Sequence, residues 1–338
     1  MSPKVSIVIL NFNTRFFLEK LIPFLIKTDY DNFEIIVADN ASIDGSADFI
    51  KEFYPEIKLI CFDENYGFAG GYNKALEQIE SDYFVLLNSD VEVTQNWLKP
   101  LISLAQSDSK IAVVQPKLLD YNSRNKFEYA GGSGGFIDKY GYPFCRGRWF
   151  NFIEFDTKQY NDTREIFWAS GACFLIKSEY WKKSGGLDED FFAHMEEIDL
   201  CWRLKNDGYK IMVCPESVVY HIGGGTLPVG NPHKTYLNFR NGLFLLCKNL
   251  NEKVLFKTLF IRFVFDGLAA FKFLTEFKFR EIAAILRAHI VFYGKMKYWL
   301  NKRKNESEKQ LHPYGMYNKS IVLGFYLYRQ KRFSQTNL

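Results

Sequence analysis

The sequence predicts an α/β protein whose mostly parallel sheet is flanked by helices and followed by a C-terminal helical extension. Up to about residue 119, short apolar runs alternate with segments of helical spacing, which is typical of a doubly wound sheet. The apolar runs stop at small polar residues, as strands do beside a ligand crevice. After about residue 235 the spacing is helical, with aromatic residues interleaved with Lys and Arg. The 338 residues suffice for one large domain with an appendage, or for two domains.

Four strands and three helices are expected near the N-terminus. The strands are apolar runs, and the helices repeat apolar residues three or four positions apart. The glycine-rich segment GFAGGYN, at 67–73, leads into the third helix. The expected strands are 5–10, 33–38, 57–62 and 83–87, and the expected helices are 16–28, one that starts at 42–46, and 67–79.

The pattern is less regular beyond the fourth strand. Residues 120–165 are rich in Gly, Tyr and Phe and are expected to be an irregular inserted loop or hairpin region, which would be either a surface excursion or a substrate lid. The other expected elements are helices at 97–104, 179–183, 194–206 and 236–300, strands at 111–119, 174–176 and 218–220, a loop at 222–226, a linker at 301–310 and an apolar segment at 321–328.

Each of the first four strands ends near a carboxylate or amide side chain. These residues are Asn11, Asp39, Asp63 and Asp90. Because parallel strands bring their carboxyl ends to one edge of a sheet, the four side chains are expected to share that edge. A carboxylate there can hold a hard cation, and the cation can hold a diphosphate. The alternative is that each polar residue only serves the turn after its strand.

Charge is distributed unevenly along the chain. From Arg240 to the C-terminus there are 19 Lys or Arg and 6 Asp or Glu, although the net charge of the whole chain is only +4. An acidic front and a basic, aromatic tail predict two surfaces with different partners. Six Cys without a CxxC pair favour a reducing compartment. No signal peptide is expected, because the N-terminal apolar run at 5–10 is too short and leads directly into a strand-and-turn pattern. No transmembrane helix is expected, because no stretch reaches 18 uncharged apolar residues.

Six segments resemble glycosyltransferase family 2 and occur in that family's order. They are VSIVILNFN, VADNASIDGS, ENYGFAGGYN, LLNSDVEV, SGACFLIKSEYWKKSGGLDEDFFAHMEEIDLCWRL and VVYHIGGGTL. The resemblance covers roughly residues 4–245, and the subgroup most similar contains bacterial rhamnosyltransferases of polysaccharide assembly. It implies a GT-A fold and an inverting transfer of a sugar from a nucleoside diphosphate to a glycan or lipid-linked glycan. Residues 1–235 would then be the catalytic domain, with a nucleotide-binding half at about 1–119 and an acceptor half at about 120–235, and 236–338 would be the basic extension.

The resemblance implies a divalent cation, Mn²⁺ or Mg²⁺, at Asp90. The family motif is Asp-x-Asp, whereas this chain has Asn88 in the first position, so one carboxylate is missing. His221 matches a family His that precedes a glycine-rich loop, and it is the second candidate ligand. An imidazole ligand favours Mn²⁺. The alternative for His221 is a structural residue at a strand end.

The catalytic base is expected in the acidic cluster Glu196, Glu197 and Asp199. The family Asp that acts as base corresponds to Glu197, with Glu196 as the second candidate. Glu196 and Asp199 share a helix face, while Glu197 points about 100° away. The alternative is that acids in a first helical turn complement the helix dipole, and that Asp199 pairs with Arg203.

The resemblance also assigns substrate contacts, each with a structural alternative. Gly67, Gly70 and Gly71 would let the backbone approach the nucleotide, or they form a strand-to-helix turn. Trp168 would pack on a sugar, or in the core. Arg240 would reach the diphosphate, or lie solvated at a helix start. The assigned residues are Asn11, Asp39, Asn65, Gly67, Gly70, Gly71, Asn88 and Asp90 for the nucleotide-sugar, Trp168, Gly171 and Asp199 for the acceptor, and Arg240 for the diphosphate.

The basic tail predicts peripheral contact with a membrane. Amphipathic helices with aromatic residues on one side and Lys or Arg on the other lie in bilayer interfaces and favour anionic headgroups. The enzyme is therefore expected in the cytoplasm, on the cytoplasmic face of the membrane. The alternative is a helical appendage packed on the catalytic domain, and no recognition motif supports nucleic-acid binding.

Three functional readings follow from the sequence. The first is a rhamnosyltransferase with dTDP-rhamnose as donor. The second is a UDP-hexose or UDP-N-acetylhexosamine transferase. The third is a nucleotide-sugar-binding protein without turnover, which the Asn88 substitution and the altered base position admit.

Overall fold

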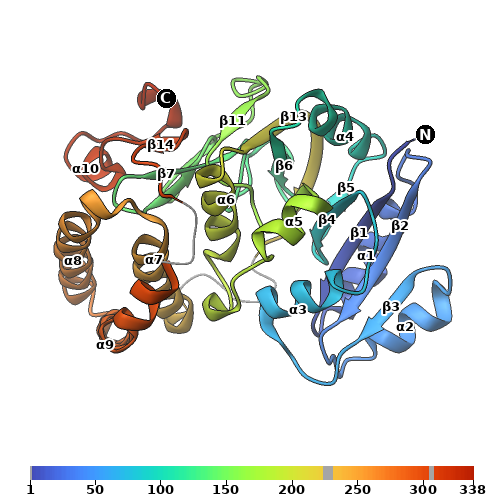
Figure 1. Cartoon of the computed structure of the whole chain (residues 1–338), viewed down its shortest axis with the longest axis horizontal. Helices are drawn as coiled ribbons and strands as arrows, with labels where there is room; N and C mark the ends of the chain where they lie inside the picture. The colour runs from blue at the N-terminus through green and yellow to red at the C-terminus, as the bar shows by residue number, and fades with distance from the viewer. Residues whose placement is uncertain (1, 224–230, 304–307) are drawn as a thin grey trace.

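A computed structural model describes residues 2–223, 231–303 and 308–338 and contains a mixed sheet flanked by helices (Figure 1). Three long helices stand together at the end of the molecule opposite the first strands. Residues 224–226 of the expected loop and 304–307 of the expected linker lie outside the described residues. The predicted α/β fold class, a sheet flanked by helices with a C-terminal helical region, is confirmed. The main sheet is mixed rather than mostly parallel, because four of the eight strand pairings among its described residues are antiparallel.

The first four strands are parallel and pair in the order β4-β1-β2-β3. Alternate residues of β1 point to opposite faces, since Ile7 and Val8 belong to different core clusters, and this explains why the strands read as continuous apolar runs. The register sets Asn11 beside Asp39 and Leu10 beside Asn88, so the polar ends of β1, β2 and β4 meet at one edge as predicted. The strands and helices of this part are β1 (Val5–Asn11), α1 (Arg15–Leu25), β2 (Phe33–Asp39), α2 (Ser46–Phe53), β3 (Lys58–Cys61), α3 (Gly67–Leu76) and β4 (Tyr83–Asn88).

The second part of the main sheet introduces antiparallel pairs. β12 is antiparallel to both β4 and β6, and β13 pairs in parallel with β6. β13 is much longer than the expected strand at 218–220, because its pairing with β6 resumes after an irregularity between Cys214 and Val218. The elements are β5 (Val91–Val93), α4 (Leu98–Ser107), β6 (Ile111–Asp120), β11 (Arg164–Ile166), β12 (Cys173–Lys177), α5 (Ser178–Ser184), η1 (Glu189–Phe191), α6 (Glu196–Asn206) and β13 (Lys210–His221).

For residues 120–165 the expected hairpin region is correct and the irregular loop is wrong, because successive strands there pair antiparallel. These residues contain β11 and four short strands of a second sheet, in the order β10-β9-β8-β7-β14. The last of these comes from the C-terminal region, so 236–338 is not a purely helical extension. Phe333 packs against Phe136 and Phe144, with ring centroids 4.7 and 6.0 Å away. The elements are β7 (Gly135–Asp138), β8 (Pro143–Cys145), β9 (Arg148–Trp149), β10 (Phe152–Ile153), β14 (Met316–Tyr317), α10 (Ile321–Tyr326) and η3 (Phe333–Gln335).

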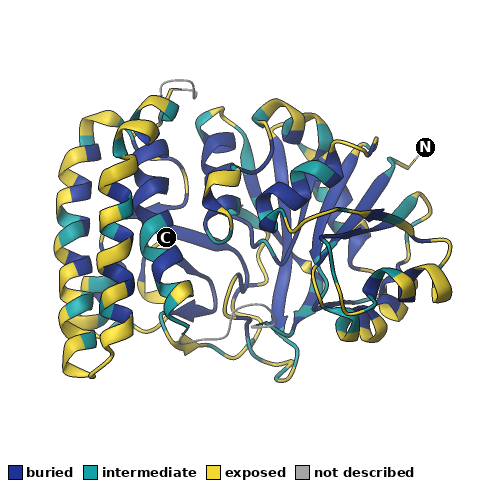
Figure 2. Cartoon of the chain, turned by 90° about the horizontal axis from the view of Figure 1, so that it is seen from below, coloured by how far each residue is buried: buried dark blue, intermediate teal, exposed yellow. Residues whose placement is uncertain are grey.

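The long C-terminal helices are α7 (Pro232–Asn249), α8 (Glu252–Thr275) and α9 (Phe279–Lys302). The side chains of Asn231 and Asn251 cap α7 and α8 by accepting from backbone N–H groups two residues later. α7 is mostly buried, whereas α8 and α9 expose their outer faces (Figure 2). Among the described residues, no helix is both long enough and apolar enough to cross a bilayer.

Candidate active site

A hydrogen-bonded edge joins the carboxyl ends of β1, β2 and β4. The Asn11 amide donates to the Asp39 carboxylate over 2.8 Å, and the backbone N–H of Ser42 donates to the same carboxylate over 2.9 Å. The Thr14 hydroxyl donates to the Ser89 hydroxyl over 2.9 Å. The edge therefore collects polar side chains from strands far apart in sequence, with both Asn11 and Asp39 buried.

Asp90 and His221 lie side by side at this edge. β5 pairs antiparallel with the end of β13, which sets His221 opposite Val91. The backbone N–H of Ile222 donates to the Asp90 carbonyl over 3.0 Å, and His221 Nε2 lies 3.1 Å from Asp90 Oδ1. The sequence placed these two residues at one site only through the family resemblance, and the strand pairing supplies the physical reason.

Glu128 is a third member of this cluster, and the sequence analysis missed it. Its Oε1 lies 3.2 Å from His221 Nδ1, and its other oxygen accepts the backbone N–H of Ala130 over 2.6 Å. Burial alone would lower the pKa of His221, but the carboxylates of Glu128 and Asp90 outweigh burial and raise that pKa to about 10. Glu128 falls in the segment expected to be irregular, so no motif or periodicity pointed to it.

The Asp90–His221 pair fits a shared divalent cation. Two ligands about 2.1 Å from one octahedral ion lie about 3 Å apart, which matches the 3.1 Å between Asp90 Oδ1 and His221 Nε2. Glu128 on the far ring nitrogen would orient the imidazole, as carboxylates do behind metal-binding histidines. To bind an ion, the imidazole must release its Nε2 proton. Within the described residues no group of three His, Cys, Asp or Glu side chains is arranged for an ion, so substrate or water would complete the coordination.

The glycine-rich segment is organised by its own turn and by close packing. Asn65 Oδ1 accepts from the backbone N–H of Gly67, whose φ of +70° suits glycine. A Cβ at Gly71 would lie 2.7 Å from the Leu10 side chain, so glycine lets α3 approach β1 closely. A Cβ at Gly70 would lie 3.2 Å from the Tyr66 Cβ, closer than such atoms usually approach. These contacts favour the structural alternative for Gly70 and Gly71, while nucleotide contact by the segment stays a prediction.

The loop that precedes α6 has a strained backbone. Phe192, His194 and Met195 all have positive φ, at 67°, 69° and 77°. The Asn241 side-chain amide, from α7, donates to three carbonyls of this loop over 2.8 to 3.0 Å. Strain of this kind persists only where the surroundings over-determine it, and it clusters at functional sites. No motif in the sequence pointed to Asn241.

α6 begins with Glu196 and Glu197 beside the end of β4. A Cβ at Gly171 would lie 3.9 Å from Glu197 Cγ, so the Glu197 stem passes close to Gly171. The neighbouring residue Ala172 accepts a 2.9 Å hydrogen bond from the backbone N–H of Asn88. The segment 171–172 therefore lies between the acid of α6 and the end of β4.

The two glutamates differ in their electrostatics. Burial raises the pKa of Glu197 to about 7. Burial, together with the nearby Glu197 carboxylate, raises the pKa of Glu196 well above its usual value. Each keeps a buried Oε2 without a hydrogen-bond partner among the described residues. Glu197 can therefore exchange a proton near neutral pH, whereas burial and the neighbouring carboxylate favour the protonated form of Glu196.

The predicted acceptor contact of Asp199 is wrong. Asp199 is fully buried, and its carboxylate accepts from Arg203 over 2.8 Å, Lys248 over 2.9 Å and Asn249 over 2.7 Å. Burial alone would raise the pKa of Asp199, but the positive charges of Lys248 and Arg203 lower that pKa to about 2. Asp199 therefore links α6 to α7. The structural alternative, a pair with Arg203, is correct, and Lys248 and Asn249 of α7 are additional partners.

Replacing Asp199 by Ala is expected to destabilise the fold by about 3 kcal/mol, since two buried cations lose a partner. In the wild type this stabilisation is complete above the unfolded pKa of about 3.9 and is lost as pH falls through the folded pKa of about 2. Urea unfolding at pH 7 measures the change. Glu19→Ala is the matched control, because Glu19 forms an exposed i,i+4 pair with Arg15 and its loss should cost about 0.5 kcal/mol or less. Equal shifts in the two variants would contradict the structural role.

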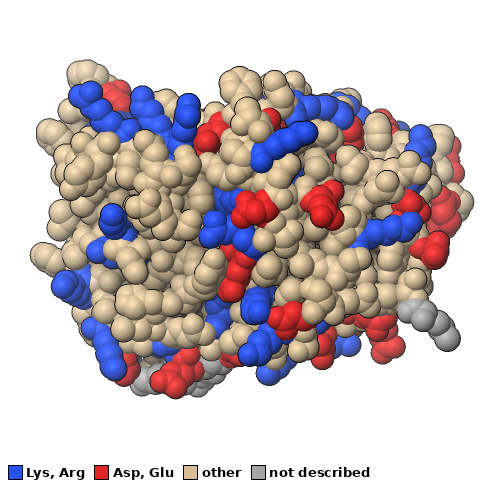
Figure 3. All heavy atoms as spheres, turned by 90° about the horizontal axis from the view of Figure 1, so that it is seen from above, with Lys and Arg blue, Asp and Glu red and all other residues tan. Residues whose placement is uncertain are grey.

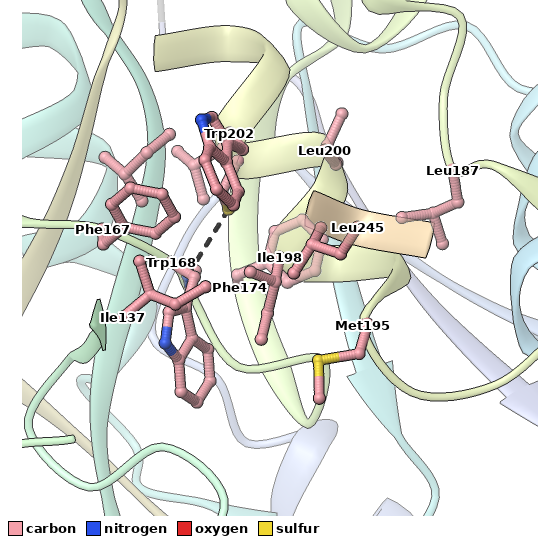
Figure 4. Packing of buried hydrophobic residues seen from close by; sticks show 14 of the residues in the cluster. Ile137, Phe167, Trp168, Phe174, Leu187, Met195, Ile198, Leu200, Trp202 and Leu245 are labelled. Carbon is pink, nitrogen blue, oxygen red and sulfur yellow. Dashed lines mark hydrogen bonds between the residues drawn. The ribbon is translucent and has the colours of Figure 1, made fainter. Parts of the chain in front are cut away.

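Trp168 does not form the floor of an acceptor site. It is 3% exposed and packs in the hydrophobic core near Ile137, Phe174 and Met195 (Figure 4). Its indole N–H donates to the Phe136 carbonyl over 2.8 Å. The predicted sugar contact is therefore wrong, and the core-packing alternative is correct.

Arg240 is engaged away from the predicted diphosphate position. Its Nη2 donates to the Phe191 carbonyl over 2.9 Å, and its Nε donates to Asn241 over 2.8 Å. The guanidinium also lies over the rings of Tyr236 and Phe244. In this conformation Arg240 supports the loop before α6, so the diphosphate contact stays a prediction.

The sheet order and the polar carboxyl edge define a GT-A glycosyltransferase fold. GalNAc-T7, solved with UDP, GalNAc and Mn²⁺, matches with a TM-score of 0.57 and 16% identity, over 74% of this chain and 48% of that one. A mannosyltransferase from Pyrobaculum calidifontis, solved with GDP-Man and Mn²⁺, matches with a TM-score of 0.53 and 12% identity, over 90% of this chain and 85% of that one.

The chain belongs to glycosyl transferase family 2, whose family model matches residues 6–185. It is 24% identical over 206 residues to the N-acetylglucosaminyl-diphospho-decaprenol L-rhamnosyltransferase of Mycobacterium tuberculosis, covering 55% of this chain and 66% of the relative. It is also 24% identical over 218 residues to the low-salt glycan biosynthesis hexosyltransferase Agl10 of Haloferax volcanii, covering 62% and 65%. The chain thus spans just under two thirds of these curated relatives. The family expected from the six sequence segments is confirmed.

Proposed function

We propose that the protein is an inverting glycosyltransferase that moves a sugar from a nucleoside diphosphate to a glycan or lipid-linked glycan in cell-surface polysaccharide biosynthesis. The observation that carries this proposal is the position of Glu197 beside Gly171, next to the β4 end that leads to Asp90 and His221. A candidate base and two candidate ligands for a cation thus lie at the same sheet edge. Displacement at an anomeric carbon needs both a base and charge stabilisation on the leaving group.

The donor would bind along the edge formed by β1, β2 and β4. Asn11 and Asp39 would meet the base or ribose, and Asn88 could donate to a ribose hydroxyl without adding charge. The names of the relatives include a rhamnosyltransferase and a hexosyltransferase, so dTDP-rhamnose and UDP-hexoses are the donors to test first. The name of the first relative also includes a diphosphate-linked decaprenol, and we propose a lipid-linked acceptor by analogy.

In the proposed reaction Glu197 removes the proton of the acceptor hydroxyl as that oxygen attacks the anomeric carbon. A pKa of about 7 lets its carboxylate form near neutral pH while keeping it basic enough to accept the proton. Asp90 and His221 would hold a divalent cation, Mn²⁺ or Mg²⁺, which supplies positive charge to the departing diphosphate when bound. Asp199, Arg203 and Lys248 keep α6 in place, so that Glu197 stays at the edge.

Release of nucleoside diphosphate is the direct test. The full chain would be assayed with dTDP-rhamnose, UDP-hexoses and UDP-N-acetylhexosamines, with isoprenyl-diphosphate-linked acceptors, in Mn²⁺ and after chelation. Metal-dependent and acceptor-dependent release supports the proposal. Tight donor binding without any release would instead favour a nucleotide-sugar-binding protein. We place the enzyme at the cytoplasmic face of the membrane, where such donors and lipid-linked acceptors meet.

Replacing Glu128 by Gln is expected to weaken Mn²⁺ affinity by about tenfold, because the imidazole of His221 loses the carboxylate that orients it. Titration with Mn²⁺, followed by the paramagnetic signal of the free ion, measures this without an activity assay. Glu92→Gln is the matched control, since Glu92 is also buried but pairs with Arg124. Unchanged affinity in Glu128→Gln would remove Glu128 from the site.

A further inference from the structure

The outer sides of α8 and α9 form an exposed apolar surface, here called the hairpin face. Its members recur three, four or eight positions apart along each helix, so they share one side of it. On α8, the residues Phe256, Phe260 and Phe271 are 66%, 69% and 64% exposed. From Phe256 to Phe271 the helix rises about 22 Å. The hairpin face consists of Phe256, Phe260, Leu268, Phe271, Leu286 and Ile290.

Exposed large apolar side chains that gather on one side of a helix pair mark an interaction site, whereas single exposed ones need no explanation. The hairpin face contributes nothing to the core, which α8 and α9 serve with their other sides through residues such as Leu259 and Phe292. Figure 2 shows the outward sides of both helices exposed along their length. The site at Asp90 makes no use of this surface.

The charge around the hairpin face is almost entirely positive. Of the acids between Lys253 and Lys302, Asp266 and Glu281 are buried, and Glu276 is paired with Lys272 and Lys278. In Figure 3 the end of the molecule that carries these helices (left) shows mostly uncharged and basic atoms. Apolar residues bordered by Lys and Arg suit the boundary between acyl chains and anionic headgroups.

We propose that the hairpin face binds the surface of a bilayer that contains anionic lipid, which gives the lipid-linked acceptor of the proposed function a physical location. The phenylalanines would enter the headgroup region, and the neighbouring lysines and arginines would meet lipid phosphates. A second copy of the chain is the less suitable occupant, because pairing two hairpin faces would bring the same positive charges together.

The hairpin face is connected to the loop before the candidate base. α9 packs on α7 through Trp299 and Phe244, whose rings stack with centroids 4.5 Å apart. From α7, Asn241 holds three carbonyls of the loop that leads into α6. A bilayer bound at α8 and α9 would therefore lie at a fixed position relative to Glu197, which suits an acceptor presented from the membrane.

Vesicle co-sedimentation of the full chain tests the proposal. Wild type is expected to bind vesicles of phosphatidylcholine with a quarter phosphatidylglycerol, and to bind pure phosphatidylcholine weakly. The triple variant Phe256→Ser, Phe260→Ser, Phe271→Ser should lose about tenfold or more in partitioning. The matched control carries Phe16→Ser, Phe24→Ser and Phe53→Ser, which remove exposed aromatics from α1 and α2. The control should bind as wild type does.

Two further measurements, of folding and of catalysis without vesicles, make each result of the vesicle assay interpretable. Circular dichroism and nucleoside diphosphate release without vesicles should match wild type in the triple variant, and this separates loss of membrane binding from loss of catalysis. If wild type releases no nucleoside diphosphate yet still binds vesicles through these residues, only the proposed function fails. Vesicle binding unchanged in the triple variant would overturn the proposal. So would a wild type that ignores vesicles and dimerises through the same residues in sedimentation velocity.

Discussion

Replacing Glu197 by Gln is expected to reduce turnover by about 10³-fold while donor binding is kept, because the amide cannot accept the proton of the acceptor hydroxyl. The side chain keeps its shape, so its contact beside Gly171 and the start of α6 should persist. Steady-state release of nucleoside diphosphate measures the loss. Calorimetric titration of nucleotide in Mn²⁺ measures the binding that remains.

The pH dependence of turnover gives Glu197 a second test. A base works deprotonated, so wild-type kcat/KM, which reports the free enzyme, should rise with pH through the folded pKa of about 7, and residual activity of the variant should lack this limb. Glu196→Gln is the neighbouring control: burial and the Glu197 carboxylate favour the neutral form of Glu196, so exchange for a neutral amide should have little effect. A severe loss in Glu196→Gln together with an active Glu197→Gln would reverse the assignment.

Replacing Asp90 by Asn is expected to lower turnover by about 10²- to 10³-fold, since the leaving diphosphate loses the charge stabilisation that this carboxylate anchors. With Asn88 in the position where the family has a carboxylate, Asp90 carries the negative charge of this motif alone. Metal-dependent nucleotide binding should also disappear, which equilibrium dialysis with Mn²⁺ can measure.

Asp63→Asn is the matched control for Asp90. Asp63 also follows a strand of the parallel sheet, but it is exposed and accepts a hydrogen bond from the Tyr66 hydroxyl. The control should keep both turnover and metal-dependent binding. A normal metal requirement in Asp90→Asn would exclude a cation held by the Asp90–His221 pair.

The fold was most predictable where it depends on local pattern. β1, β2 and β4 read as apolar runs because both of their faces are buried, and their polar ends met as the topology requires. The second sheet was missed for two reasons. Its strands have two to four residues, too few to show alternation, and β7 pairs with Met316 and Tyr317 from the far end of the chain. Sequence separation of that size leaves no local signal.

The candidate site was likewise predictable only where its residues stand in a local sequence pattern. The candidates Asp90, His221 and Glu197 could be named from the sequence because they stand in motifs. In the structure Asp90 lies beside His221, and Glu197 lies beside Gly171. The sequence did not indicate Glu128, which contacts His221, or Asn241, which donates to the loop before α6. Both lie in segments with no motif. Trp168 and Asp199 were misassigned because a motif position says nothing about whether the side chain faces the core or the substrate.

The pairing of β14 with β7 also has a consequence for biosynthesis. The ribosome makes β7 roughly 10 to 40 s before β14, at about 5–20 residues per second. During that interval the β7 edge lacks its final partner, and the Asp138 carboxylate lacks the Ile321 N–H that it later accepts over 2.9 Å. An open edge of this kind attracts other strands. We therefore expect the nascent chain to present an open β7 edge until its C-terminal residues emerge, and a chain that stops before β14 to keep that edge unpaired.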